Sequence, residues 1–130
     1  MRLVLTLLAL LLVASLAVGA PPPGVEQTDP QTGVWFRSLH QPGTGALCCG
    51  ISDCRAVKAR ATDGHYEALI DRQSFGPEAP DDWVRVPDGA VLRDVVSWVD
   101  HPVACWSSFY YKGEPQPSGG LRCFIRSAEG

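Results

Sequence analysis

The chain is short of basic side chains, and this shortage limits the partners it can have. Its 130 residues include 11 Lys and Arg against 14 Asp and Glu, a formal net charge of −3. The charges are mixed along the chain, so neither a basic patch nor an acidic tail stands out. Because binding to nucleic acid depends on a positive field around the phosphates, we expect no nucleic-acid partner.

Catalytic and metal-binding motifs are also missing. The chain has no H-E-x-x-H, no G-x-S-x-G and no phosphate-binding glycine loop. Asp63, His65 and Glu67 alternate, so on a strand they would share one face and could bind a metal. Asp63 belongs to a turn, however, and a solvated strand face explains the remaining pair better. His40 and His101 lie near prolines, with nothing that couples them to a nucleophile. We therefore expect no enzyme, no cofactor and no metal site.

One long apolar run opens the chain. The segment from Leu3 to Ala20 is almost wholly apolar, Arg2 precedes it, and no further Lys or Arg occurs before Arg37. This pattern is typical of a secretory signal peptide. The alternative is a membrane anchor, for which the run is at the low edge of the about 20 residues that a span needs. We predict a signal peptide at residues 1–19, and hence a periplasmic or secreted protein with no stable membrane insertion afterwards.

The next segment is rich in proline and glycine. Residues 20–33, "APPPGVEQTDPQTG", hold little apolar surface to offset the entropy of ordering. We predict a disordered Pro-rich leader at 20–33, followed by a single β-rich domain at 34–130. A domain of this size has a small core and marginal stability.

Five cysteines lie in the predicted domain. An exported domain this small is a natural carrier of disulfides. No C-x-x-C redox pair is present, and the spacing fits no common zinc site. We expect structural disulfides, with a metal-binding or redox-sensing thiol as the alternative. The residues concerned are Cys48, Cys49, Cys54, Cys105 and Cys123.

Ring size favours bridges that leave the 48–54 loop, and the place of each cysteine in the chain favours particular partners. Bridges inside the 48–54 loop would close only small rings, whereas bridges to Cys105 and Cys123 are worth about 4 kcal/mol each in the chain-entropy model. Cys54 begins the first predicted hairpin strand, whereas the double cysteine lies in a Gly-flanked loop that can reach the last strand. We therefore expect Cys54 to pair with Cys105, and Cys48 or Cys49 to pair with Cys123. A Cys105–Cys123 bridge is the main alternative. The leftover cysteine is either a buried thiol or the site of an intermolecular bridge, and we expect the buried thiol, because an exposed one would not stay free in an oxidising compartment.

The clearest structural signal is a β-hairpin. Asp63-Gly64 is a favoured two-residue hairpin turn, between strands predicted near 55–62 and 65–71. Pairing outward from this turn places Arg60 opposite Glu67 on a polar face. The other face is apolar and should point inward, with Tyr66, Ala68 and Ile70.

Several further elements complete the predicted fold. Trp35, Phe36 and Leu39 fit one helical turn, "WVRVP" fits a strand that ends at Pro87, and residues 88–94 fit a short helix or turn. Residues 95–100 favour neither a helix nor a strand. Residues 103–111 and "LRCFIR" read as strands, and 113–120 as an exposed loop. We predict a mainly β fold: a small, disulfide-stapled antiparallel β domain with at most one short helix, after a signal peptide.

The strand predicted at 103–111 carries a run of aromatic residues, "CWSSFYY". Alternation would place Trp106 and Tyr110 on one face, and Cys105 and Phe109 on the other. Filling a small core is one explanation of these rings. The other is an exposed contact site beside the 113–120 loop, formed by Trp106, Tyr110 and Tyr111, for a protein, peptide or glycan partner.

Three stretches resemble a group of small exported alphaproteobacterial proteins: "WFRSLHQPGTGALCCGISDC", "WVRVPDGAVL" and "LRCFI". The shared pattern is W-F-x-S-L, then C-C-x4-C, then W-V-x-V-P and a terminal C-F, and it covers most of residues 35–126. The resemblance implies a Gram-negative periplasmic or secreted location and one compact domain. The group has no assigned activity, so no functional residue carries over. We expect an exported, non-enzymatic binding or structural module.

Overall fold

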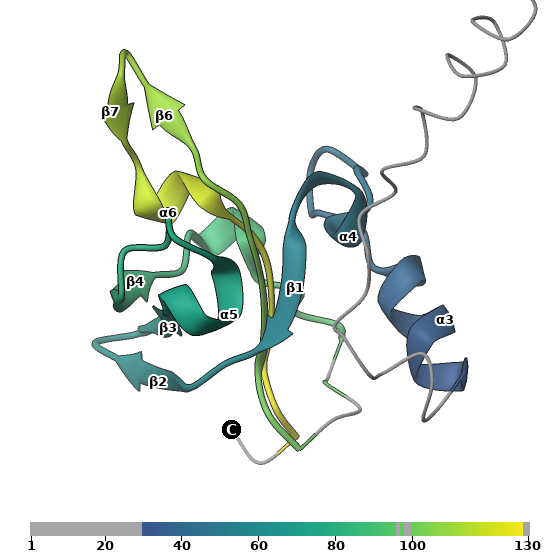
Figure 1. Ribbon diagram of the computed structural model, residues 1–130. Coiled ribbons are helices and arrows are strands. Elements are labelled where there is room, and N and C mark those ends of the chain that lie inside the picture. The colour runs from purple at the N-terminus through teal and green to yellow at the C-terminus, as the bar shows by residue number, and fades with distance from the viewer. Residues whose placement is uncertain (1–29, 96, 98–99, 129–130) are drawn as a thin grey trace, which may run out of the picture.

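Figure 1 shows the computed structural model, which describes residues 30–95, 97 and 100–128. The predicted signal peptide, and residues 20–29 of the predicted leader, lie outside the described residues. Helix α3 (Pro30–Ser38) begins four residues before the expected start of the domain. Its predicted turn at Trp35 and Phe36 is confirmed, and Phe36 is buried.

The described residues form three small antiparallel sheets, which confirms the mainly β fold. One sheet has the order β1-β5-β8, with β5 in its centre, and another has the order β2-β3-β4. The third is a two-stranded hairpin of β6 and β7. The strands are β1 (Asp53–Ala56), β2 (Ala59–Thr62), β3 (His65–Ile70), β4 (Asp82–Arg85), β5 (Val103–Trp106), β6 (Tyr110–Tyr111), β7 (Glu114–Pro115) and β8 (Leu121–Ile125).

Short helices connect these strands, and the described part of the chain holds more of them than the one expected. Besides α3 they are α4 (Cys48–Ile51), α5 (Arg72–Phe75), the 3-10 helix η1 (Asp88–Ala90) and α6 (Pro117–Gly120). Each of these four is a single turn. Asp71 caps α5 by accepting a hydrogen bond from the Ser74 amide. The helix or turn predicted at 88–94 is confirmed by η1.

The central β1-β5-β8 sheet separates two apolar clusters. All four residues of β5 are buried, because both faces of the sheet are covered. One cluster lies against the β2-β3-β4 sheet and includes Ile70, Trp106 and Phe124. The other includes Phe36 of α3 and the five cysteines. In Figure 1, α3 and α4 lie on one side of β1, and β2, β3 and α5 lie on the other.

The predicted hairpin register is confirmed. Arg60 lies opposite Glu67, Ala59 opposite Ala68, and the turn residues Asp63 and Gly64 both have positive φ, as a two-residue hairpin turn requires. The inward face is also as predicted: Ala68 and Ile70 are fully buried, and Tyr66 packs against Phe124 with ring centroids 5.2 Å apart.

The first strand of this hairpin is not continuous over 55–62. It divides at residues 57–58 into β1 and β2, which belong to different sheets. The Val57 amide donates to the Pro102 carbonyl, and the Leu69 amide donates to the Lys58 carbonyl. These two hydrogen bonds fix the backbone at the point where the chain passes from one sheet to the other. Long-range pairing with β5 therefore overrides the local hairpin pattern here.

The strand predicted at 103–111 is also interrupted, and the predicted loop at 113–120 contains regular structure. The register against β8 shifts between Cys105 and Trp106, where β5 ends. Beyond this point the Ser107 amide donates to the carbonyl of Gly120. The chain then continues into the β6–β7 hairpin and into α6, which returns to β8.

Candidate functional site

A pocket of about 280 Å³ lies where α5 and its following loop meet the segment after β5. One wall is formed by residues 72–80, and the other by residues 106–110 and 115–117. The lining residues are mostly aromatic and proline side chains with a few polar groups: Arg72, Pro77, Glu78, Ala79, Pro80, Trp106, Ser108, Phe109, Tyr110, Pro115, Gln116 and Pro117. This composition is typical of ligand pockets, although the volume is at the small end.

Trp106 anchors the pocket from inside. Its side chain is only 4% exposed, so Trp106 does not share an exposed face with Tyr110, and the prediction that at least one of Trp106, Tyr110 and Tyr111 is exposed is met by the two tyrosines. The indole Nε1 donates to the Pro117 carbonyl over 3.0 Å, and the ring meets Phe75 edge to face at 5.9 Å. The turn of α6 folds over the indole, because Gly120 leaves room for the close approach.

The two tyrosines are exposed, as predicted. Tyr110 is 53% exposed and Tyr111 is 59% exposed, and both lie on β6, next to residues 113–120. Figure 1 shows that the β6–β7 hairpin projects away from the rest of the molecule. Its tip is a turn in which Lys112 and Gly113 have positive φ. The Lys112 ammonium lies 5.4 Å from the Tyr111 ring centroid. The hairpin therefore presents aromatic surface at the rim of the pocket.

The sequence did not predict two parts of this site, Phe109 and the wall formed by residues 77–80. Phe109 was placed on the face of Cys105, but the interruption after β5 turns it into the pocket wall, where the Arg122 guanidinium lies 4.9 Å from its ring centroid. The wall formed by residues 77–80 was read as part of a loop. A signal for both walls was available, since proline clusters occur at 77–80 and at 115–117.

A second, more open hollow of about 530 Å³ lies between α3 and residues 88–95. Its lining includes His40, Asp88, Arg93 and Asp94, all of them exposed. His40 Nδ1 is 2.7 Å from the Ser38 carbonyl, a local contact within one turn. The hollow lacks the gathering of rings that marks the first pocket, and we regard it as a weaker candidate.

The predicted disulfides are confirmed, and the structure settles the choice that the sequence left open. All five cysteines are described: Cys54 is bonded to Cys105, and Cys48, not Cys49, is bonded to Cys123. Cys49 remains as a thiol that is only 5% exposed, as expected for the leftover cysteine. Burial raises the pKa of this thiol to about 11, while Arg55 lowers the pKa and Asp53 raises it. The thiol is therefore protonated at neutral pH.

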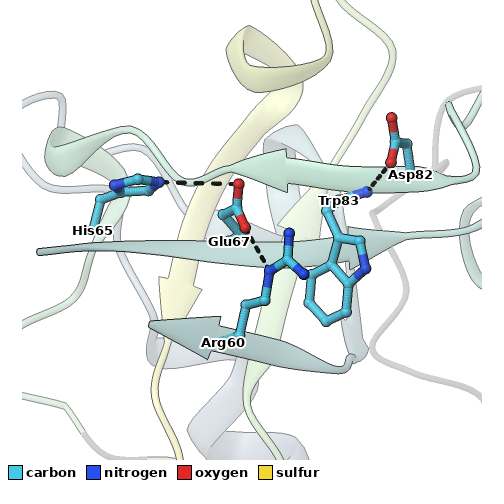
Figure 2. A network of polar contacts seen from close by, with 5 residues as sticks. All are labelled: Arg60, His65, Glu67, Asp82 and Trp83. Carbon is cyan, nitrogen blue, oxygen red and sulfur yellow. Dashed lines mark hydrogen bonds and ion pairs between the residues drawn. The ribbon is translucent and has the colours of Figure 1, made fainter. Parts of the chain in front are cut away.

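The polar face of the hairpin forms a small network (Figure 2). Arg60 is paired with Glu67, and its guanidinium lies 4.3 Å from the ring centroid of Trp83. His65 Nε2 is 4.0 Å from a carboxylate oxygen of Glu67. Surface pairs of this kind are worth up to about 1 kcal/mol. Within the described residues, no three potential metal ligands gather here or elsewhere. The network joins β2, β3 and β4.

Among the described residues, no helix has the length and apolar character that crossing a membrane requires.

Comparisons with known proteins found no relative of this chain. No protein-family model, no curated protein and no solved structure matches the chain.

Proposed function

We propose that the protein is an exported, non-enzymatic binding module that acts in the periplasm or outside the cell. Its site is the aromatic pocket together with Tyr110, and its ligand is an extended, proline-containing segment of a partner protein. The observation that carries the proposal is the position of Tyr110, which is half-exposed and lines a pocket whose floor is the buried Trp106.

The chemistry of the lining favours this class of ligand. Rings of Trp106, Phe109 and Tyr110 and several prolines offer flat apolar surfaces, and Gln116 and Ser108 add hydrogen-bonding groups. Proline-rich segments adopt the polyproline II conformation, which presents ring faces and exposed carbonyls. Such segments dock in aromatic-lined grooves and lose little entropy, because they are already extended.

The rigidity of one wall supports a preformed site. Trp106 is held by its bond to Pro117 and by its contact with Phe75. The other component, the β6–β7 hairpin, is a two-stranded ribbon, which by itself is of marginal stability. A ligand would therefore meet a fixed floor and an adjustable rim. Aromatic residues that fill well-packed, desolvated pockets are the usual centres of binding energy at interfaces.

The test is a binding titration with a matched pair of variants. A fluorescein-labelled peptide with P-x-x-P repeats is titrated with the native protein, with Tyr110→Ala and with Tyr111→Ala. Tyr110 lines the pocket, whereas its neighbour Tyr111 is absent from the described lining, and the two are similarly exposed. We expect Tyr110→Ala to weaken binding by about tenfold or more, the loss typical of an aromatic anchor. Tyr111→Ala should change it by less than about twofold.

Two results would contradict the proposal. One is the absence of saturable binding of the peptide to the native protein, and binding of oligosaccharides in its place would assign the site to glycans. The other is an equal loss in the two tyrosine variants, which would place the contact on the hairpin and not in the pocket. A peptide in which alanine replaces each proline serves as the ligand control.

The alternative function, a metal-binding or thiol redox-sensing protein, has weaker support. The Cys49 thiol is only 5% exposed and its pKa is raised to about 11, so it is a poor metal ligand and is shielded from outside reagents.

A further inference from the structure

The five cysteines gather in one buried cluster on the α3 side of the central sheet. Cys54 of β1 lies directly opposite Cys105 of β5, which in turn lies directly opposite Cys123 of β8. Cys48 and Cys49 come from α4, the single turn that precedes β1. The free thiol of Cys49 therefore belongs to the same cluster as both disulfides. Five cysteines leave one unpaired, and its place in the cluster suggests a role.

The position of the Cys49 sulfur is the decisive observation. Its Sγ lies 3.0 Å from the Sγ of Cys54, and its other polar contact is the Phe36 carbonyl at 3.6 Å. A disulfide bond is about 2.05 Å long, so a movement of about 1 Å would bring these two sulfurs to bonding distance. Cys54 is already half of the bridge to Cys105. A thiol in contact with a disulfide sulfur is the arrangement from which exchange proceeds.

We propose that Cys49 and the Cys54–Cys105 bridge form an internal thiol–disulfide exchange device, which interconverts two pairings of the chain. In the forward step, Cys49 loses its proton and its sulfur attacks the Cys54 sulfur. The Cys49–Cys54 bond forms, the Cys54–Cys105 bond breaks, and the electron pair and a proton go to the Cys105 sulfur. The numbers of disulfides and thiols are unchanged, so no outside oxidant or reductant takes part.

The exchange changes which elements are cross-linked. In the resting pairing, β1 is bonded to the central strand β5. In the alternative pairing, β1 is bonded to α4, its own neighbour in the sequence, and the edge of the sheet loses its cross-link. The resting bridge closes a ring between residues 51 positions apart, whereas the alternative would close a ring of six residues. Because the larger ring removes more entropy from the unfolded chain, the resting pairing is the stable one, and the alternative is the minor state.

Burial controls the rate of this exchange. Only the thiolate attacks, and the rise in the pKa of Cys49 from 9.0 to about 11 on burial lowers the thiolate fraction at neutral pH about a hundredfold. The charged groups that act on its pKa, Arg55 and Asp53, both belong to β1 and have opposite effects. Below a pH of about 11 the thiolate fraction rises tenfold for each pH unit. The exchange rate of the native protein should follow this rise.

Tryptic mapping distinguishes the two pairings directly. Cleavage at Arg and Lys leaves Cys48, Cys49 and Cys54 on one peptide (38–55), Cys105 on a second (94–112) and Cys123 on a third (123–126). In the resting pairing all three peptides are joined. After exchange, peptide 94–112 is released by itself with a free Cys105. The readout depends on pairing alone and is independent of the proposed binding function.

The experiment incubates the intact, oxidised protein at pH 7, 8 and 9. N-ethylmaleimide is present throughout, so that each Cys105 thiol formed by exchange is trapped and the minor pairing accumulates; samples are then quenched in acid, unfolded and digested. We expect labelled peptide 94–112 to appear about tenfold faster for each pH unit. Label that stays on peptide 38–55 at every pH, or that appears on peptide 123–126 in its place, would overturn the proposal. Cys49→Ser is the matched control, and it should release no labelled peptide.

A second variant keeps the proposal testable if Cys49→Ser does not fold. In Cys105→Ser, exported to an oxidising compartment, Cys49 and Cys54 have no other partner in contact. We expect these two cysteines to be found bonded to each other, with the Cys48–Cys123 bridge intact. Recovery of both Cys49 and Cys54 as free thiols would show that they cannot reach bonding geometry, and the proposal would fail.

Discussion

Replacing Gly120 by alanine tests how the floor of the aromatic pocket is built. Gly120 is the last residue of α6 and is buried against Trp106. A Cβ atom at this position would lie 2.1 Å from the Ser107 carbonyl oxygen and 2.7 Å from the indole Nε1. Both distances are far inside van der Waals contact, and the oxygen belongs to the backbone. The α6 turn must therefore move away from β5.

The size of the stability loss follows from the packing and the hydrogen bonds that this movement disrupts. Overpacking of a buried site costs about 1 to 3 kcal/mol. The Ser107 amide would also lose its 3.0 Å bond to the Gly120 carbonyl, and Trp106 would lose its bond to Pro117. Each of these is worth about 1 kcal/mol. We expect Gly120→Ala to lower the free energy of unfolding by about 3 kcal/mol, and the Tm by about 15 °C for a domain of this size.

The measurement is urea unfolding, followed by circular dichroism and by tryptophan fluorescence. Gly89→Ala in η1 is the matched control, because a Cβ at Gly89 would meet nothing within 4 Å. We expect that control to stay within about 0.5 kcal/mol of the native protein. If Gly120→Ala is as stable as Gly89→Ala, then α6 does not pack on Trp106 as described, and the floor of the pocket is placed wrongly.

Two further predictions concern the hairpin turn and the buried thiol. Gly64→Val should destabilise the protein by about 1 kcal/mol or more in urea unfolding, because Gly64 has φ of 80°; Gly64→Asn, which tolerates this conformation, is the control, and equal losses in the two variants would contradict the turn assignment. The Cys49 thiol should titrate near pH 11 in the folded protein, against 9.0 for an ordinary thiol. The fold prefers the neutral thiol, so its contribution to stability is full below pH 9 and falls as the pH rises toward 11, by on the order of 2 kcal/mol. The thiolate absorbance of the native protein minus that of Cys49→Ala measures this pKa, and a midpoint near 9 would show that the thiol is not buried.

Local patterns were sufficient for the elements whose partners are close in sequence. The register of β2 against β3 follows from the Asp63-Gly64 turn and the two-residue period of a strand, because a slip of one residue would expose the whole apolar face. The two long-range disulfides were also predictable, since ring size favours bridges from the 48–54 loop to Cys105 and Cys123. The mainly β fold follows from the same alternation and turn signals. The signal peptide, the leader and the exported location stay predictions from the sequence.

Only the tertiary structure decided the features that depend on contacts between distant segments. β1 leaves the hairpin because pairing with β5 is available, and no local pattern reports that partner. The strand of aromatic residues ends at Trp106 because α6 folds back onto the indole, which buries this ring and leaves Tyr110 and Tyr111 exposed. The choice of Cys48 over Cys49 has the same kind of cause. Adjacent residues in a helical turn point in different directions, and only the placement of α4 against β8 determines which sulfur reaches Cys123.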